Sequence, residues 1–346
     1  MKMCKRGVIY PTMLCNLRCT FCYYRFLKKE KHRSFEDVRK ELDKLKFYYN
    51  LEAVDITGGE PTVYPDIVKM VKYCSEINLK PTIITNAQRT NIFPKLIENG
   101  LDDLLISIHG YKPDHDKGVA KKGAYDQIMK TIKVLKEYDF KFRVNCTMTK
   151  FNYKNLPKYA KAMIKIEPRK INFICFNPHE GTDWAKINTV KFQAKYSEIT
   201  PFLQKAIDIL DASGIWVNVR YFPLCMMRGY EKHVCNFHQW QYDPYEWEYK
   251  SGFKLTKEQI SELTKIARMT SFGKTDEEKL LNYLVSWSTK NNLFLPTCQK
   301  CRNYEICYGI YPQYLRRFGG KEFIPVPGKR IKDPIYYRRK DLRWRE

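Results

Sequence analysis

Long apolar runs and carboxylates are what this sequence has least of. No stretch approaches the about 18 uncharged apolar residues that a membrane-spanning helix needs, and the N-terminus has no apolar segment that ends in a small-residue cleavage site. Disordered, collagen-like and coiled-coil classes are also excluded, because 44% of the 346 residues are hydrophobic and 14% are aromatic. We therefore expect a soluble cytoplasmic protein without a membrane partner, made of one large and one small domain.

The scarcity of carboxylates leaves a large positive charge. The chain has 62 Lys and Arg against 38 Asp and Glu, a net charge of +24. Such a field attracts anions of many kinds. The charge has a local maximum from Lys329 to Arg345, where Tyr336, Tyr337 and Trp344 interrupt the basic residues. We interpret the excess as a solvated surface, and contact with nucleic acid is the alternative.

Cysteine is abundant, with twelve residues in the chain. The reducing cytoplasm disfavours a disulfide framework, and clustered cysteines there are more often metal ligands or redox groups. Cys15, Cys19 and Cys22 form a C-x3-C-x2-C run, and a C-x2-C-x5-C run lies near the other end. The second run consists of Cys298, Cys301 and Cys307. The other cysteines are scattered along the chain, at Cys4, Cys74, Cys146, Cys175, Cys225 and Cys235.

Three thiolates on one short loop suit three corners of a [4Fe–4S] cluster, and they leave the fourth iron open. An open coordination position is what distinguishes a catalytic metal centre from a structural one. The alternative is a structural zinc site made from the two C-x2-C pairs, Cys19 with Cys22 and Cys298 with Cys301.

The run from Cys15 to Cys22, with the aromatic Phe21 before its last cysteine, resembles the signature of the radical S-adenosylmethionine (SAM) superfamily. Further features follow in that superfamily's order. They are Gly58-Gly59-Glu60-Pro61 after an apolar run, Thr85-Asn86, Ser107-Ile108-His109-Gly110, and Arg143-Val144-Asn145.

The resemblance implies a cofactor and a reaction. Cys15, Cys19 and Cys22 would hold a [4Fe–4S] cluster whose open iron binds SAM, and reductive cleavage of SAM would give methionine and a 5′-deoxyadenosyl radical. Phe21 would pack near the adenine. The motif Gly58, Gly59, Glu60 and Pro61 would hold the methionyl end, and Asn86 and Ser107 would contact the ribose or the carboxylate. We expect His109 to be a packed histidine outside the chemistry, and we assign no catalytic residue.

Apolar, β-branched runs alternate with amphipathic stretches in the first two thirds of the chain, which predicts a parallel sheet with helical crossovers. The predicted strands are 6–10, 53–57, 82–85, 103–108, 141–147 and 171–176, and the predicted helices are 35–49, 66–78, 92–99, 123–138 and 154–166. The resemblance implies an α/β fold, the superfamily's partial (β/α)6 barrel. A helix at 195–212 and a strand at 215–221 are expected to lead out of it. In the fifth strand, Cys146 is expected to face the outer helices.

The pattern changes at Pro223. The C-terminal cysteines are similar to the SPASM or twitch extension of many radical SAM enzymes, which carries auxiliary iron–sulfur clusters. This similarity groups Cys225 with Cys298, Cys301 and Cys307 around one auxiliary [4Fe–4S] cluster, with Cys235 in reserve and zinc as the alternative. Helices are expected at 255–269 and 275–289. The predicted domains are 1–222 for the barrel, 223–325 for the extension and 326–346 for a basic tail.

We therefore expect a radical SAM enzyme that works under anaerobic conditions with a reducing donor such as flavodoxin or ferredoxin. Its substrate would be a peptide or a sugar-like small molecule. One alternative is modification of tRNA or other nucleic acid by the same chemistry. An alternative of another class is a metal-cluster protein that binds nucleic acid without turnover. A hydrogen-atom donor role for Cys175 is the less favoured alternative to packing.

Overall fold

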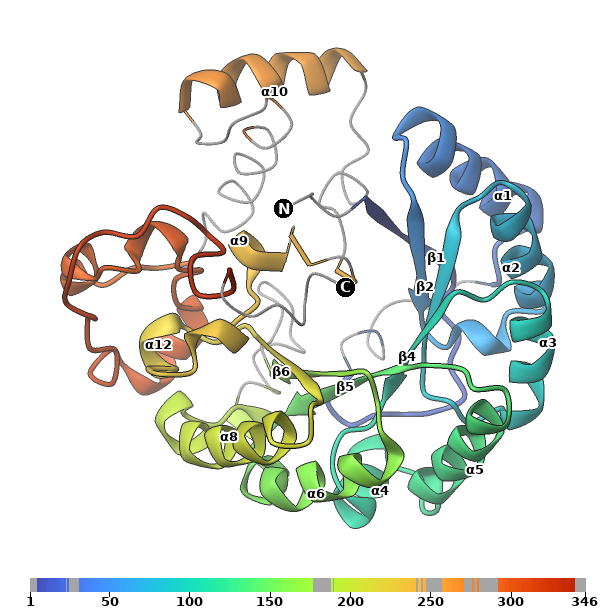
Figure 1. Cartoon of the computed structure of the whole chain (residues 1–346), viewed down its shortest axis with the longest axis horizontal. Coiled ribbons are helices and arrows are strands. Elements are labelled where there is room, and N and C mark those ends of the chain that lie inside the picture. The colour runs from blue at the N-terminus through green and yellow to red at the C-terminus, as the bar shows by residue number, and fades with distance from the viewer. Residues whose placement is uncertain are drawn as a thin grey trace. The chain divides into compact units, whose positions relative to one another are not determined.

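The computed structural model (Figure 1) describes residues 5–22, 24, 31–176, 188, 190–240, 242–243, 245–246, 257–270, 276, 279 and 292–339. The chain divides into two compact units. One is Val8–Asn218, and the other combines Met1–Gly7 with Val219–Glu346. None of the helices within the described residues is long and apolar enough to cross a membrane.

A curved seven-stranded sheet is the centre of the fold, and its strands lie side by side in chain order. The strands are β1 (Arg6–Thr12), β2 (Ala53–Gly58), β3 (Lys80–Thr85), β4 (Asp103–Ser107), β5 (Arg143–Met148), β6 (Lys170–Cys175) and β7 (Trp216–Arg220). The register from β2 to β6 is parallel throughout. Because parallel strands need crossovers, helices cover the outer face of this sheet (Figure 1). The α/β partial barrel is therefore confirmed.

Seven helices within the described residues connect the strands of the sheet. They are α1 (Phe35–Asp43), α2 (Ile67–Glu76), α3 (Phe93–Glu98), α4 (Lys112–Val119), α5 (Ala124–Glu137), α6 (Leu156–Ile166) and α8 (Tyr196–Asp211). The Ser34 hydroxyl accepts a hydrogen bond from the Asp37 amide at the start of α1. Gly100, with φ of +93°, follows α3, where an L side chain would be strained.

The interior of the unit Val8–Asn218 follows the predicted alternation. In β5, Val144, Cys146 and Met148 are fully buried, whereas Asn145 and Thr147 on the other face are partly exposed. The fully buried Cys146 thiol lies beside the Tyr159 side chain of α6, so it faces the outer helix as expected.

Two elements differ from the sequence prediction. The segment expected to lead out of the barrel forms β7, the seventh strand of the same sheet. Helix α4 was not predicted, because only His115 and Val119 of its eight residues are buried and it shows no apolar periodicity. Continuation of α1 into a π-helical turn at Lys44–Tyr48 accounts for the rest of the helix expected at 35–49.

The other unit holds short elements instead of βα repeats. Its helices are α9 (Phe237–Trp240), α10 (Lys257–Thr270) and α12 (Pro312–Phe318), with short 3-10 turns at Leu224–Met226, Pro296–Lys300 and Tyr304–Ile306. The helix expected at 255–269 is α10, and the one expected at 275–289 lies outside the described residues apart from 276 and 279. Residues 326–339 of the predicted basic tail belong to this unit.

Candidate active site

The three cysteines of the N-terminal run lie on the loop after β1 and face one cavity. Cys15, Cys19 and Cys22 line this cavity of about 170 Å³ together with Arg18 and Gly59. Burial and the neighbouring Cys22 and Cys15 thiols raise the pKa of Cys19. Three thiols that disfavour one another's ionisation suit a site where a cation or a cluster compensates the charge.

The loop is held by the end of α4. The amide and the hydroxyl of Thr20 both donate to the Gly118 carbonyl, at 2.8 and 3.0 Å. Leu17 packs with Val119 and Ala124, and Cys15 and Cys19 pack against this cluster. Leu17 also donates its amide to the Cys15 sulfur at 3.4 Å. The first cysteine site thus depends on a helix that sequence patterns do not reveal.

The two glycines after β2 allow the cysteine loop to approach the sheet. The amides of Gly59 and Glu60 donate to the carbonyls of Thr12 and Leu14, at 3.0 and 2.8 Å. A Cβ atom on Gly58 would lie 2.2 Å from the Thr12 carbonyl oxygen, and one on Gly59 would lie 2.1 Å from that of Leu14. The close approach at these two glycines is therefore toward the chain that carries Cys15.

Glu60 is buried and ties the ends of β2 and β3 together. Its carboxylate accepts hydrogen bonds from the Thr62 amide and hydroxyl, from the Thr85 hydroxyl at 2.6 Å and from the Asn86 amide at 2.7 Å. Burial raises its pKa, although these four donors act in the opposite direction. Pro61 opens a 3-10 turn, Pro61–Val63, that the same carboxylate caps.

Asn86 extends this network to the cysteines. Its side-chain amide donates to the side-chain oxygen Oδ1 of Asn16 at 2.7 Å and lies 3.8 Å from the Cys15 sulfur. Ser107, at the end of β4, pairs with Asn145 of β5 and is partly exposed. The structure therefore brings Glu60 and Asn86 to the cysteine loop, whereas Ser107 is not among the lining residues of that cavity.

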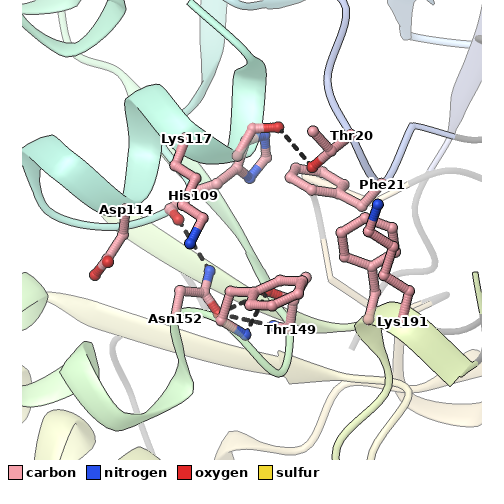
Figure 2. A pocket seen from close by; sticks show the side chains of 11 residues that line it. Thr20, Phe21, His109, Asp114, Lys117, Thr149, Asn152 and Lys191 are labelled. Atoms are coloured by element: carbon pink, nitrogen blue, oxygen red, sulfur yellow. Dashed lines mark hydrogen bonds between the residues drawn. The ribbon is translucent and has the colours of Figure 1, made fainter. Parts of the chain in front are cut away.

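A second cavity, of about 210 Å³, is lined by Phe21 of the cysteine loop (Figure 2). Besides Phe21 and Thr20, its lining includes His109, Asp114, Lys117, Asn152 and Lys191. The Phe21 ring meets the His109 ring edge to face, with 4.8 Å between centroids. This pocket has the mixed apolar and polar lining of a small-molecule site. Sequence reasoning left His109 out, since a lone histidine gives no signal of its surroundings.

The four C-terminal cysteines meet in a separate, tight cavity. Cys225, Cys298, Cys301 and Cys307 line about 20 Å³ together with apolar and aromatic side chains. Cys235 lies elsewhere, fully buried, with its thiol 3.9 Å from a carboxylate oxygen of Asp243. Burial and the three other thiols raise the pKa of Cys225, and burial above all raises that of Cys307 to about 11.

Backbone amides point at these sulfurs. The Val326 amide donates to Cys301 at 3.3 Å and the Gly309 amide to Cys307 at 3.4 Å. Hydrogen bonds to the cysteine sulfurs and burial from solvent are features that tune the reduction potential of a protein-bound iron–sulfur cluster. Across the described residues, no three His, Cys, Asp or Glu side chains converge on one metal ion.

Comparison with known proteins gives a consistent picture. Residues 9–163 match the family model of the Radical SAM superfamily. The chain is 30% identical over 236 residues to the cysteine-type anaerobic sulfatase-maturating enzyme of Clostridium novyi, covering 60% of each protein. It is 28% identical over 169 residues to the Fe-coproporphyrin III synthase of Methanosarcina barkeri, covering 48% of this chain and 41% of that one.

The fold is similar to that of a solved structure. The structure of Streptococcus suis SuiB bound to S-adenosylmethionine superposes with a TM-score of 0.57 over 93% of this chain and 76% of that one, at 19% sequence identity. At this identity the likeness concerns the fold. The match spans less than two thirds of the length of both curated relatives.

Proposed function

Because the chain belongs to the radical SAM superfamily, we propose that it is an enzyme that cleaves SAM reductively and takes a hydrogen atom from an organic substrate. The observation that supports this most is the convergence of Cys15, Cys19 and Cys22 on one cavity, with Phe21 of the same loop lining a second pocket of about 210 Å³. Cys15, Cys19 and Cys22 would hold a [4Fe–4S] cluster, which in its reduced form would supply the one electron needed to cleave SAM into methionine and a 5′-deoxyadenosyl radical.

The chain's own residues hold and orient the reactants. Three thiolates would bind three irons and leave the fourth for SAM. Phe21 would pack against the adenine in the neighbouring pocket. The exposed backbone around Gly59 lies in the cysteine cavity, where the methionyl end would sit. Glu60 would position the loop around Gly59 and would not bind SAM itself, because its carboxylate already accepts four hydrogen bonds from within the protein.

We propose that Asn86 and Ser107 contact the ribose or the carboxylate of SAM. Asn86 lies beside Cys15 and Asn16, so its amide can turn toward a bound carboxylate. Ser107 lies at the carboxyl end of β4, the edge where ligands bind in parallel α/β sheets.

For the extension we propose one auxiliary [4Fe–4S] cluster on Cys225, Cys298, Cys301 and Cys307, as in a SPASM or twitch-like module. Its support is that all four thiols share one dry cavity and Cys235 does not. For the substrate we propose a peptide, which accords with a relative named as a sulfatase-maturating enzyme. A sugar-like or other small molecule is the second candidate, and a flavodoxin or ferredoxin is the proposed electron donor.

The test is anaerobic reconstitution with iron and sulfide, followed by dithionite, SAM and an assay for 5′-deoxyadenosine. The wild-type chain should hold about eight irons and form 5′-deoxyadenosine. Replacing Cys15, Cys19 and Cys22 by Ala should leave about four irons and abolish the product. A matched control, Cys74→Ala in α2, removes a buried thiol of the same unit and should keep both. Unchanged product from the triple variant would refute the proposal.

A further inference from the structure

The pocket beside the cysteine loop contains a histidine whose hydrogen-bonding role is set by the fold. His109 follows β4, is only 8% exposed, and lines the cavity against the edge of Phe21 (Figure 2). The Thr147 amide of β5 donates a hydrogen bond to His109 Nδ1 at 3.1 Å. A ring nitrogen that accepts this bond cannot carry a hydrogen. The neutral ring therefore has its hydrogen on Nε2.

The ring and its backbone are fixed from several sides. The His109 amide donates to His115 Nδ1 at 3.1 Å, and its carbonyl accepts from the Asn152 side chain at 2.9 Å. The same Asn152 amide group donates to the Thr147 carbonyl at 2.8 Å, so it links β5 to the His109 loop. Such support holds a binding group in place before a ligand arrives.

The ring stays neutral at physiological pH. Burial, with a smaller contribution from His115, lowers the pKa of His109 to about 3. Of the other polar groups that line the pocket, Lys117 and Lys191 are flexible cations and Asp114 can only accept when ionised. Thr20, Thr149 and Asn152 also line the pocket, but their side-chain donors are already bonded within the protein. The Nε2–H of His109 is therefore the donor that we assign to a ligand.

We propose that His109 is a specificity-determining residue, whose Nε2–H donates a hydrogen bond to an unprotonated ring nitrogen of the adenine of SAM. This inference rests on the proposed function, since it takes the pocket as the adenosyl site. A flat base that packs against the Phe21 ring would lie next to the His109 ring, because the two rings already contact each other at right angles. A purine without an acceptor at that place would leave the buried N–H without a partner, which costs affinity.

The test measures binding rather than turnover. Iron-loaded protein is titrated anaerobically with S-adenosylhomocysteine and with its 1-deaza, 3-deaza and 7-deaza analogues, each of which lacks one ring acceptor. The wild-type chain should bind one deaza analogue about 5- to 20-fold more weakly than the parent compound. His109→Phe keeps an aromatic ring without the donor, so it should bind the parent more weakly by a similar factor and lose the discrimination. His109→Gln keeps an N–H donor and should retain part of the discrimination between the parent compound and its deaza analogues.

The outcomes separate the two claims. Equal affinity of the wild-type chain for all the analogues, or unchanged binding and discrimination in His109→Phe, would overturn the role of His109 and leave the proposed function intact. Failure of the iron-loaded wild-type chain to bind S-adenosylhomocysteine at all would overturn both. The analogue series needs no variant, so the role remains testable if His109→Phe does not fold.

Discussion

Single residues decide whether the first cysteine site can form. Gly59 has no positive φ, so its requirement for glycine comes from contact alone: any Cβ would meet the Leu14 carbonyl at 2.1 Å. The carboxylate of the neighbouring Glu60 accepts four hydrogen bonds, two from Thr62 in the turn after β2 and two from Thr85 and Asn86 at the end of β3. The motif is therefore a junction between two strands and the cysteine loop as much as a ligand contact.

We predict that Gly59→Ala lowers the free energy of unfolding by about 2–4 kcal/mol and reduces the iron bound at the first site, because backbone must move to admit the methyl group. Gly118→Ala is the matched control. It also lacks a positive φ, and its Cβ would meet only the Phe21 ring, at 3.4 Å. In a helix this change should be neutral or stabilising by up to about 1 kcal/mol. Urea unfolding and iron content measure both, and equal effects would contradict the contact argument.

A second residue-scale prediction concerns Cys225 and Cys235. Cys225→Ala should lower the iron content from about eight to about four or five per chain, because it removes one of four thiols from the dry cavity. Cys235→Ala should leave the iron content unchanged, since its thiol lies beside Asp243. Iron analysis and Mössbauer spectra of the two variants decide this. Loss of iron from the Cys235 variant alone would exchange the two assignments.

At the scale of elements, the C-terminal segment is built into the second cysteine site. Arg330 donates to the carbonyls of Cys301 and Gln299, at 3.0 and 2.6 Å, and its guanidinium lies over the Tyr304 ring. The Ile331 amide donates to the Arg302 carbonyl. Arg338 is buried and donates to the carbonyls of Val234 and His233. In the described part of this segment, Arg330 and Arg338 are therefore hydrogen-bonded within the fold, whereas a solvated basic surface was the interpretation from the sequence.

This arrangement predicts that Arg330→Ala releases iron from the second site to a chelator faster than the wild-type chain does. Two hydrogen bonds from a partly exposed guanidinium are worth about 1–2 kcal/mol, so the release should be about 5- to 30-fold faster. Lys329→Ala removes the same charge from the exposed neighbouring position and should change little. Equal release from both variants would mean that charge, and not the two contacts, holds the loop.

At the scale of the whole molecule, buried histidines make the barrel unit sensitive to acid. Burial lowers the pKa of His109 to about 3 and that of His115 to about 4, against 6.5 ordinarily. Between pH 6.5 and about 4 the unfolded chain binds more protons than the folded one. Stability is therefore complete above pH 6.5 and declines as the pH falls below it.

We expect the free energy of unfolding of this unit to fall by about 2–3 kcal/mol between pH 7.5 and 5.5 from these two histidines, at about 1.4 kcal/mol for each. Urea unfolding at both values, followed by circular dichroism, measures the change. The double variant His109→Gln with His115→Gln should lose most of this dependence. An unchanged slope would mean that other groups cause it.

The net charge of +24 is also a property of the whole molecule. It favours anionic partners in general, and the nucleic-acid alternative rests on it. Since Arg330 and Arg338 are engaged within the fold, the tail adds less to that alternative than its composition suggests. Binding of tRNA that weakens steeply with salt would support it, and no binding at low salt would remove it.

Patterns that are local along the chain were enough to predict the α/β fold and to indicate the first cysteine site. Cysteine spacing indicated the cluster site, and alternating periodicities predicted six strands and the helices between them, because both signals are local along the chain. Tertiary structure alone decided the rest. Helix α4 has no apolar stripe, yet it carries Gly118, which holds the cysteine loop. Cys225 joins the C-terminal thiols and Cys235 does not, and His109 faces a pocket, because both depend on packing between segments far apart in the chain.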